Sequence, residues 1–341
     1  MSTARKNWIM PEACLRSSSP LLVVAFSILA AGAPAQAATT ITFDVPGATY
    51  TEPAAINDSG TITGMFTAPG RRGFMRTADG TFTTFRVKGE SATYPMGINR
   101  HGVITGYYVD HQGVGHGFVR SKHGKLTLFD VPGALYTEPF GIDDSGAVAG
   151  QYVVSVNIVH GFVRAPDGSI TTFNVSGAAS TYVSSMNGKG EIGGWYLMTD
   201  GTADGFVRAA DGAITTYNVD GQGATYAAGI NGGGAATGFY NHGSDQSGFV
   251  RGRDGKIVTF DVQNAWATEA TAVDDTGTIV GSYYVSGGHE EHAFLRSKTG
   301  NIATIDVAGE ELTYPVGINN AGVVAGECYD GNGFHGFIRT P

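Results

Sequence analysis

A repeat of 42 to 45 residues runs through this chain and limits what it can fold into. Phe43 and Phe129 begin two nearly identical stretches, FDVPGATYTEPAAINDSGTITG and FDVPGALYTEPFGIDDSGAVAG. Triplets of the form [FYI]-x-V mark the copies, and they start at Phe43, Phe85, Phe129, Phe173, Tyr217, Phe260 and Ile305. Such a period, with four short β segments in each copy, is typical of a β-propeller blade.

The second copy shows how four strands, A to D, fit one period: residues 93–99, 103–109, 116–121 and 125–131. Each A–B turn contains a glycine, which can take the positive φ of a tight hairpin. An Asn or Asp just before that turn can accept its backbone N–H groups. These residues are Asn57, Asn99, Asp143, Asn187, Asn231, Asp274 and Asn319.

Strand B carries a glycine in every copy, from Gly64 to Gly326. Glycine inside a strand is unfavourable unless another group packs close to it. We therefore expect an aromatic ring from the neighbouring blade to lie against each of these glycines.

The two ends of the repeat region predict how the ring closes. Residues 40–45 supply a lone D strand, and residues 335–340 end the chain on a C strand. Pairing them removes two exposed strand edges. The predicted fold class is all-β: one domain, residues 38–341, forming a seven-bladed β-propeller of four-stranded antiparallel blades, closed by the N-terminal strand joining the C-terminal blade.

Residues 1–37 have the layout of a signal peptide. A basic start precedes the apolar run PLLVVAFSILAAG (20–32), and APAQA supplies small residues for cleavage after Ala37. The alternative is a retained membrane anchor, for which the run is short. We expect a protein secreted from a bacterial cytoplasm to the periplasm or the outside, with no membrane insertion after the signal is removed.

The net charge and the number of cysteines limit which partners and covalent links are expected. Residues 1–37 hold three of the 21 basic and one of the 30 acidic side chains, so the remainder carries 18 positive and 29 negative charges, a net charge of −11. Such a surface repels phosphate, and we expect no nucleic-acid partner. Cys328 is the one cysteine outside residues 1–37, so no internal disulfide is expected. We expect a monomer.

Two positions near the start of strand A are the candidate functional positions. The first is a threonine in every copy: Thr51, Thr93, Thr137, Thr181, Thr225, Thr268 and Thr313. An identical residue in all copies favours a repeated hydrogen bond that ties blade to blade. The second alternates in type and forms a candidate ligand-binding ring at the channel mouth: Glu52, Tyr94, Glu138, Tyr182, Tyr226, Glu269 and Tyr314.

The alternating ring could bind a polyhydroxylated ligand, with tyrosines stacking on sugar faces and glutamates accepting hydroxyl hydrogens. The alternative is that these side chains merely fill the mouth. A glycosidase needs two carboxylates about 5–9.5 Å apart, yet no two of these three glutamates come from neighbouring copies. No catalytic residue is therefore assigned.

Other repeated polar residues favour structural roles. Strand C ends in an arginine in every copy, predicted to pair across strands with the Asp or Asn of the triplet or to cap backbone carbonyls. These arginines are Arg76, Arg120, Arg164, Arg208, Arg251, Arg296 and Arg339. Four histidines of strand C, predicted to be packing residues, are His116, His160, His292 and His335.

Metal and cofactor motifs are weak or missing. The stretch HEEH (289–292) lacks the two-histidine spacing of a zinc protease, and DDSG (143–146) and DDTG (274–277) lack the alternating acids of a calcium loop. No G-x-S-x-G, phosphate loop or paired C-x-x-C occurs. We predict no metal and no cofactor.

The elements GIN-x-x-G-x-I-x-G-x-Y and HAFLR (292–296) resemble the bacterial HAF extracellular repeat family. Most copies have Gly-Phe where the family has Ala-Phe, and arginine replaces its frequent tryptophan. The resemblance implies a secreted, repeat-built protein of propeller type, with no assigned reaction.

Three functions remain open at this stage. The first is an exported non-enzymatic binding or scaffold protein that engages a glycan or an envelope protein through the channel mouth and the variable B–C loops. The second is a carbohydrate-active or lactone-active propeller enzyme, a hydrolase or lyase, with a perturbed ionisable group in the channel. The third is a purely structural surface protein, whose channel would be plugged by side chains.

Overall fold

The computed structural model describes residues 38–156, 158–285 and 291–341. The chain divides into two compact units, residues 1–37 and 38–341, and the predicted signal peptide lies outside the described residues. Among the residues described, no helix is long and apolar enough to cross a membrane. The predicted β content is confirmed, because every regular element of the second unit is a strand.

The strands follow one another in groups of four, A to D. The first three complete groups are β2 (Tyr50–Ile56), β3 (Ile62–Thr67), β4 (Arg71–Arg76), β5 (Phe82–Phe85); β6 (Ala92–Ile98), β7 (Ile104–Val109), β8 (Gly115–Arg120), β9 (Leu126–Phe129); and β10 (Tyr136–Ile142), β11 (Val148–Ser155), β12 (Ile158–Arg164), β13 (Ile170–Phe173).

The next three groups are β14 (Ala178–Met186), β15 (Ile192–Met198), β16 (Ala203–Arg208), β17 (Ile214–Tyr217); β18 (Thr225–Ile230), β19 (Ala236–His242), β20 (Asp245–Arg251), β21 (Ile257–Phe260); and β22 (Ala265–Val273), β23 (Ile279–Val285), β24 (Glu291–Arg296), β25 (Ile302–Thr304). The last group contains β26 (Leu312–Ile318), β27 (Val324–Tyr329) and β28 (Phe334–Thr340), with β1 (Thr39–Phe43) as its fourth strand.

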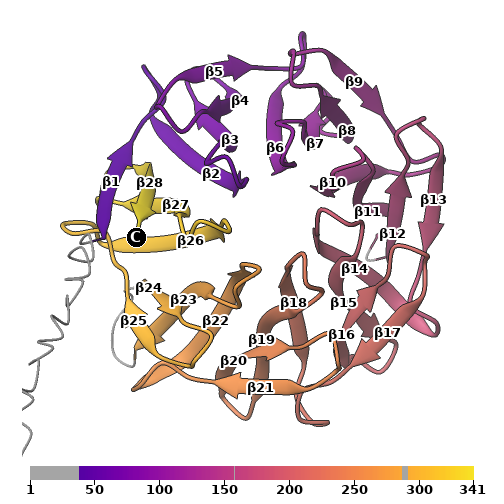
Figure 1. Cartoon of the computed structure of the whole chain (residues 1–341). Helices are drawn as coiled ribbons and strands as arrows, with labels where there is room; N and C mark the ends of the chain where they lie inside the picture. The colour runs from indigo at the N-terminus through magenta and orange to yellow at the C-terminus, as the bar shows by residue number, and fades with distance from the viewer. Residues whose placement is uncertain (1–37, 157, 286–290) are drawn as a thin grey trace, which may run out of the picture. The chain divides into compact units, whose positions relative to one another are not determined.

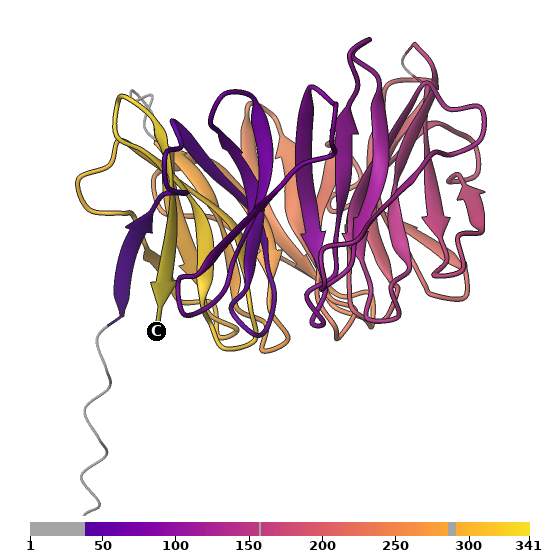
Figure 2. The same cartoon turned by 90° about the horizontal axis from the view of Figure 1, so that it is seen from above.

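Within each group the strands pair antiparallel in chain order, A with B, B with C and C with D. Two pairs of neighbouring groups are joined further by a single parallel contact, β4 to β6 and β20 to β22. The groups lie side by side in a ring, with the A strands innermost and the D strands at the periphery (Figure 1). Seen from the edge, the strands run between the two faces of this ring (Figure 2).

The first strand of the described chain pairs with the last one. β1 lies antiparallel to β28, with Thr40 opposite Arg339 and Phe43 opposite Gly336. The hydroxyl oxygens of Thr39 and Thr340 are 2.6 Å apart. The N-terminal D strand predicted from residues 40–45 therefore completes the sheet that begins with β26.

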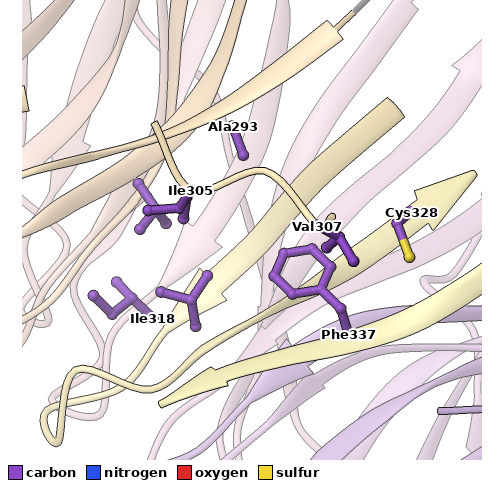
Figure 3. Packing of buried hydrophobic residues seen from close by; sticks show 8 residues of the cluster. Ala293, Ile305, Val307, Ile318, Cys328 and Phe337 are labelled. Carbon is purple, nitrogen blue, oxygen red and sulfur yellow. The ribbon is translucent and has the colours of Figure 1, made fainter. Parts of the chain in front are cut away.

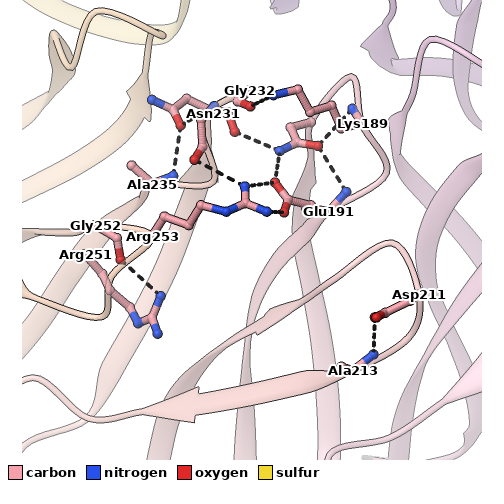
Figure 4. A network of polar contacts seen from close by, with 12 residues as sticks. Lys189, Glu191, Asp211, Ala213, Asn231, Gly232, Ala235, Arg251, Gly252 and Arg253 are labelled. Atoms are coloured by element: carbon pink, nitrogen blue, oxygen red, sulfur yellow. Dashed lines mark hydrogen bonds and ion pairs between the residues drawn. The ribbon is translucent and has the colours of Figure 1, made fainter.

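The A–B turns are built as the sequence predicts. Their glycines have φ between 75° and 91°. The preceding Asn or Asp accepts two turn N–H groups; Asn57 Oδ1, for example, accepts from the amides of Ser59 at 3.1 Å and Thr61 at 3.0 Å. The asparagines also donate to the next turn, as Asn57 Nδ2 does to the carbonyl of Asn99 at 2.9 Å. One such turn-to-turn contact, Asn187 to Asn231, lies beside the ion pair of Glu191 and Arg253 (Figure 4).

The strand-B glycines show a different contact from the one predicted. A Cβ on Gly194 would overlap the carbonyl oxygen of Tyr182 and the ring of Phe206, both in the same group of strands. The cause is a register shift in strand A between Val183 and Ser185, which brings its backbone over the glycine. The expected ring from a neighbouring blade is wrong at this position.

The hydrophobic core has two parts: side chains buried within each group of strands and side chains buried between neighbouring groups. A phenylalanine of strand C is fully buried in every group: Phe74, Phe118, Phe162, Phe206, Phe249, Phe294 and Phe337. Between the last two groups, Val307, Ile318 and Phe337 pack with Ala293 and Cys328 (Figure 3). Cys328 is free, and burial raises the pKa of its thiol to about 12, so it behaves as a small apolar residue.

Candidate functional site

The alternating Glu/Tyr positions lie on the A strands, opposite the residue that follows the constant strand-B glycine. Strand A starts at the face where the B–C loops lie, so this level is the channel mouth on that face. The cross-strand pairs are Glu52–Met65, Tyr94–Tyr107, Glu138–Gln151, Tyr182–Trp195, Tyr226–Phe239, Glu269–Ser282 and Tyr314–Glu327. The mouth is therefore lined by two varying positions in each copy.

A cavity of about 640 Å³ occupies the channel below this level. Trp195, Tyr226 and Phe239 form part of its wall, and most of the remaining lining is apolar. Its volume lies within the range of roughly 300–1,000 Å³ that is common for ligand pockets. The structural-protein alternative predicted a plugged channel, and this cavity counts against it.

The cavity ends at an apolar waist made by the last residue of each A strand. These residues are Ile56, Ile98, Ile142, Met186, Ile230, Val273 and Ile318. They also line a second, polar cavity of about 370 Å³ at the opposite end, among the A–B turns. The channel thus has two chemically different ends separated by aliphatic side chains.

One side of the mouth is an aromatic wall, defined here as Tyr182, Trp195, Tyr226 and Phe239. The rings of Tyr182 and Trp195 stack with centroids 4.0 Å apart and planes at 13°. Trp195 meets Tyr226 edge-on at 5.1 Å, and Tyr226 contacts Phe239 at 5.1 Å. Because β14, β15, β18 and β19 carry these rings, the wall spans two neighbouring groups.

The opposite side is an acidic group, defined here as Glu52, Glu269, Glu291 and Glu327. Burial, and then the negative charges of Glu52 and Glu291, raise the pKa of the Glu327 carboxyl to about 7. Burial, reinforced by Glu291, likewise raises the pKa of Glu269. These carboxylates therefore interact with one another in a partly desolvated place.

Glu291 interacts electrostatically with Glu269 and Glu327. The residue is only 8% exposed. Burial and then hydrogen bonding to Glu291 raise the pKa of Tyr284, and burial followed by the charge of Glu291 raises that of Tyr314 to about 12. Both phenols thus stay protonated and can donate to carboxylates.

Arg71 stands at the border between the acidic group and the neighbouring tyrosines. Its Nη1 donates to the hydroxyl of Tyr94 at 2.8 Å. Tyr94 in turn stacks on Tyr107 at 4.8 Å. Burial raises the pKa of Glu52, and the positive charge of Arg71 opposes that rise.

The structure brings together some predicted ring members and separates others. Glu52 and Glu269 belong to the acidic group, Tyr314 interacts with it, and Tyr182 and Tyr226 belong to the aromatic wall. Glu138 lies apart, where its Oε2 accepts a hydrogen bond from Gln151 Nε2 at 3.0 Å.

The expected separation of the carboxylates took only strand A into account. Glu327 on strand B and Glu291 on strand C add two carboxyls, and Glu327 interacts electrostatically with Glu52, as Glu291 does with Glu269. Trp195, Tyr107 and Tyr284 were missed in the same way. A signal was available for Glu327 and Trp195, because the residue after the constant strand-B glycine varies in a repeat whose neighbouring positions hardly change.

The seven threonines of strand A share one contact. Each Oγ1 accepts the backbone N–H of the triplet valine that leads into its group, at 3.0–3.2 Å. All seven are buried. The hydrogen bond fixes the connection between consecutive groups, and burial keeps these hydroxyls away from a ligand.

The strand-C arginines contact rings and carbonyls. Six of them place the guanidinium over the aromatic ring that ends the preceding group, 4.6–5.1 Å from its centroid. The same six donate to the next residue's carbonyl at 3.3–3.5 Å. Arg339 lies opposite Thr40 in the pairing of β28 with β1.

Three of the triplet aspartates contact histidines instead of these arginines. Asp130 accepts from His116 Nδ1 at 2.9 Å, Asp306 contacts His292 at 2.8 Å, and Asp44 contacts His335 at 2.9 Å. The expectation of arginine–aspartate pairs is replaced here by histidine–aspartate pairs, because the histidine lies directly before the glycine that packs under the D-strand ring. These three histidines are hydrogen-bonded to aspartates as well as packed.

The stretch 289–292 is only partly described: His289 and Glu290 lie outside the described residues. Across the described ranges, no three His, Cys, Asp or Glu side chains are grouped so as to hold a metal ion. Asp143 and Asp274, from the calcium-like stretches, instead accept turn N–H groups.

Comparisons with known proteins identify the fold. No family model matches the chain, and no curated protein matches it; the resemblance to HAF repeats stays a prediction. Three solved structures are similar over most of the chain. A streptogramin B lyase is 16% identical (TM-score 0.60; 89% of this chain, 98% of that chain), and virginiamycin B lyase from Staphylococcus aureus is 13% identical (0.60; 89% and 99%).

The third is the β-propeller domain of the Trilobed protease from Pyrococcus furiosus, 8% identical (TM-score 0.62; 87% of this chain, 94% of that chain). At these identities the likeness concerns the fold alone. The described part of this chain is an all-β structure of β-propeller type.

Proposed function

We propose that this protein is an exported, non-enzymatic binding protein that holds a glycan at the channel mouth, with the B–C loops beside it as further contact surface. One observation carries the proposal: three rings of the aromatic wall, Trp195, Tyr226 and Phe239, line a cavity of about 640 Å³, and they occupy positions that vary within an otherwise constant repeat. A scaffold needs no such variation, since constant residues already hold its strands together.

The contacts suit a saccharide. Sugar rings present C–H faces that pack on aromatic rings, and their hydroxyls donate to carboxylates. Trp195 is held by Tyr182 on one face and by the edge of Tyr226, so its orientation is fixed before a ligand arrives. A fixed aromatic platform loses little side-chain entropy on binding.

A glycan array followed by calorimetry tests the proposal. We expect the wild-type protein to bind at least one glycan, and Trp195→Ala to weaken that binding more than tenfold. Tyr136→Ala is the matched control, because Tyr136 is an exposed ring on β10 away from the cavity lining. An empty array, or equal binding by Trp195→Ala, would remove the proposal.

A second function is favoured by Glu327. A carboxyl with a pKa of about 7 can accept or donate a proton at neutral pH, as a hydrolase or lyase requires. Screening the purified protein against polysaccharides and lactones, with and without divalent metal, distinguishes this alternative. Turnover that disappears in Glu327→Gln would establish it, whereas binding without turnover would support the first proposal.

We also propose that residues 38–341 form seven blades closed into one ring, the seventh combining β26–β28 with β1. The pairing of β1 with β28 supports this closure, as does a turn-to-turn hydrogen bond of 3.2 Å from Asn319 Nδ2 to the carbonyl of Asn57. Export rests on the leader-like residues 1–37, and mass spectrometry of the secreted protein should show Ala38 as the first residue.

A disulfide tests the closure. Because the hydroxyls of Thr39 and Thr340 are 2.6 Å apart, Thr39→Cys with Thr340→Cys should form a disulfide upon oxidation. Linking the two ends should stabilise the fold by about 3–5 kcal/mol, since the loop closed is very long. Peptide mapping identifies the bond, and thiols that remain reduced in the folded protein would contradict closure.

A further inference from the structure

The cavity that three rings of the aromatic wall border is largely apolar below those rings. Among the described residues that line it, none is charged. The side-chain hydroxyls below the rings are those of Ser184, Ser185 and Thr271. A sugar ring carries hydroxyls on most of its carbons, and each hydroxyl buried without a partner costs free energy. The sugar is therefore expected to stay at the level of Trp195 and Tyr226, which leaves the deeper part of the cavity for a different chemical group.

Two layers of side chains line this deeper part. The first, called the upper layer here, is contributed by the residue two positions after the Glu/Tyr position on each A strand, and the second is the apolar waist. All seven residues of the upper layer are partly exposed, as side chains that face an open space should be, and five of them are apolar. They are Ala54, Met96, Phe140, Ser184, Ala228, Thr271 and Val316.

The depth of the cavity suits a hydrocarbon chain of moderate length. On β18, Ile230 of the apolar waist lies four residues after Tyr226, a rise on the order of 10 Å in an extended strand. Below the waist, the second cavity is lined by polar residues of the A–B turns. An unbranched chain that follows the channel from the aromatic wall would therefore bury its methylenes as far as the waist and gain little beyond it.

We propose, building on the proposed function, that the ligand is a glycan that carries an unbranched hydrocarbon chain. The sugar packs on Trp195 and Tyr226, and the chain lies in the cavity between the upper layer and the apolar waist. Each buried methylene strengthens binding about three- to fourfold. An unsubstituted sugar leaves the apolar lining in contact with water, so the site selects the substituted form.

A series of alkyl β-glucosides with methyl, butyl, hexyl, octyl and dodecyl chains tests this inference. Their affinities are measured by calorimetry, below the concentrations at which they form micelles. We expect affinity to rise about threefold per methylene up to the octyl glucoside, and to level off once the chain reaches the waist. Trp195→Ala should weaken all five glucosides by a similar factor, because it removes the contact with the sugar.

Two substitutions that narrow the cavity locate the chain. Ala54→Phe on β2 and Ala228→Phe on β18 each add a ring to the upper layer, and each should reduce the ratio of octyl to methyl affinity at least tenfold. Val258→Phe is the matched control: Val258 is 41% exposed on β21, away from the cavity lining, and its substitution should leave the ratio unchanged. Thermal unfolding identifies the folded variants, and either alanine substitution alone suffices for the test.

The outcomes separate this inference from the proposed function. If unsubstituted glycans bind on the array but affinity does not rise with chain length, the chain inference is overturned and the binding function stands. A rise that continues unchanged to the dodecyl glucoside, or an unchanged ratio in the folded alanine variants, also contradicts the inference. If 1-octanol binds as tightly as octyl glucoside, or if no glucoside and no array glycan binds, both proposals are overturned.

Discussion

At one end of the channel the A–B turns repeat nearly the same hydrogen bonds from copy to copy, whereas at the other end neighbouring copies differ in charge and aromaticity. Asn57 and Asn99 each cap their own turn and donate to the next turn. Trp195 and Glu327 occupy one equivalent position in their copies, yet Trp195 stacks on an aromatic ring and Glu327 is repelled by the charges of other carboxylates. Constant positions hold the ring together, and varied positions give its mouth a specific chemistry.

The largest effect on stability is expected at the end of the channel formed by the A–B turns. Asn57→Ala leaves the amides of Ser59 and Thr61 and the carbonyl of Asn99 without this partner, in a buried place. Unfolding free energy should fall by about 3 kcal/mol, measured by urea denaturation. Asn57→Asp keeps the acceptor and loses the donor, so its loss should be smaller. Equal losses would show that the turn cap contributes nothing.

At the channel mouth, removing the charge of Glu327 should stabilise the folded protein. The pKa of Glu327 is raised from 4.5 to about 7 in the folded protein, so the folded state binds the proton more tightly than the unfolded state between these values. Stability therefore decreases as pH rises through this window. Glu327→Gln should be about 2 kcal/mol more stable than wild type at pH 8 and nearly equal at pH 4.

Denaturation of both proteins at the two pH values measures this difference. If Glu327→Gln were more stable than wild type by the same amount at pH 4 and pH 8, the Glu327 carboxyl would not titrate in this range. Its charge would then not distinguish the channel mouth from the A–B turns.

The smallest effect is a gain in stability at an A–B turn. Asp143 caps its turn as the asparagines do, but its carboxylate has no hydrogen to donate to the carbonyl of Asn187. Its Oδ2 reaches the next turn, 3.2 Å from where a Cβ of Gly190 would lie. Asp143→Asn should restore the missing contact and raise stability by about 1 kcal/mol. If Asp143→Asn instead lowers the unfolding temperature, the turn-to-turn hydrogen bonds do not stabilise the protein.

Much of the fold could be predicted because its signals are local. The turn glycines, the Asn caps and the short strands each follow from a few adjacent residues, as Asn57 and Gly60 illustrate. The neighbour of Gly194 could not be predicted, because it depends on a register shift in the paired strand, which sequence spacing does not reveal.

The residues of the candidate site likewise divide into those that the sequence predicts and those that it does not. Tyr182 and Tyr226 stood out because the residue type at their strand-A position alternates between copies. Glu327 and Glu291 reach the mouth from strands B and C, and their grouping depends on how strands of different copies meet in space. Glu291 was considered only as part of HEEH, a stretch whose first two residues lie outside the described structure.

The apolar waist has a consequence for the two ends. Its seven side chains line both cavities. A linear ligand that enters at the mouth would therefore meet apolar side chains halfway and the polar A–B turns beyond them, so the distribution of polar groups along that ligand decides how deeply it inserts.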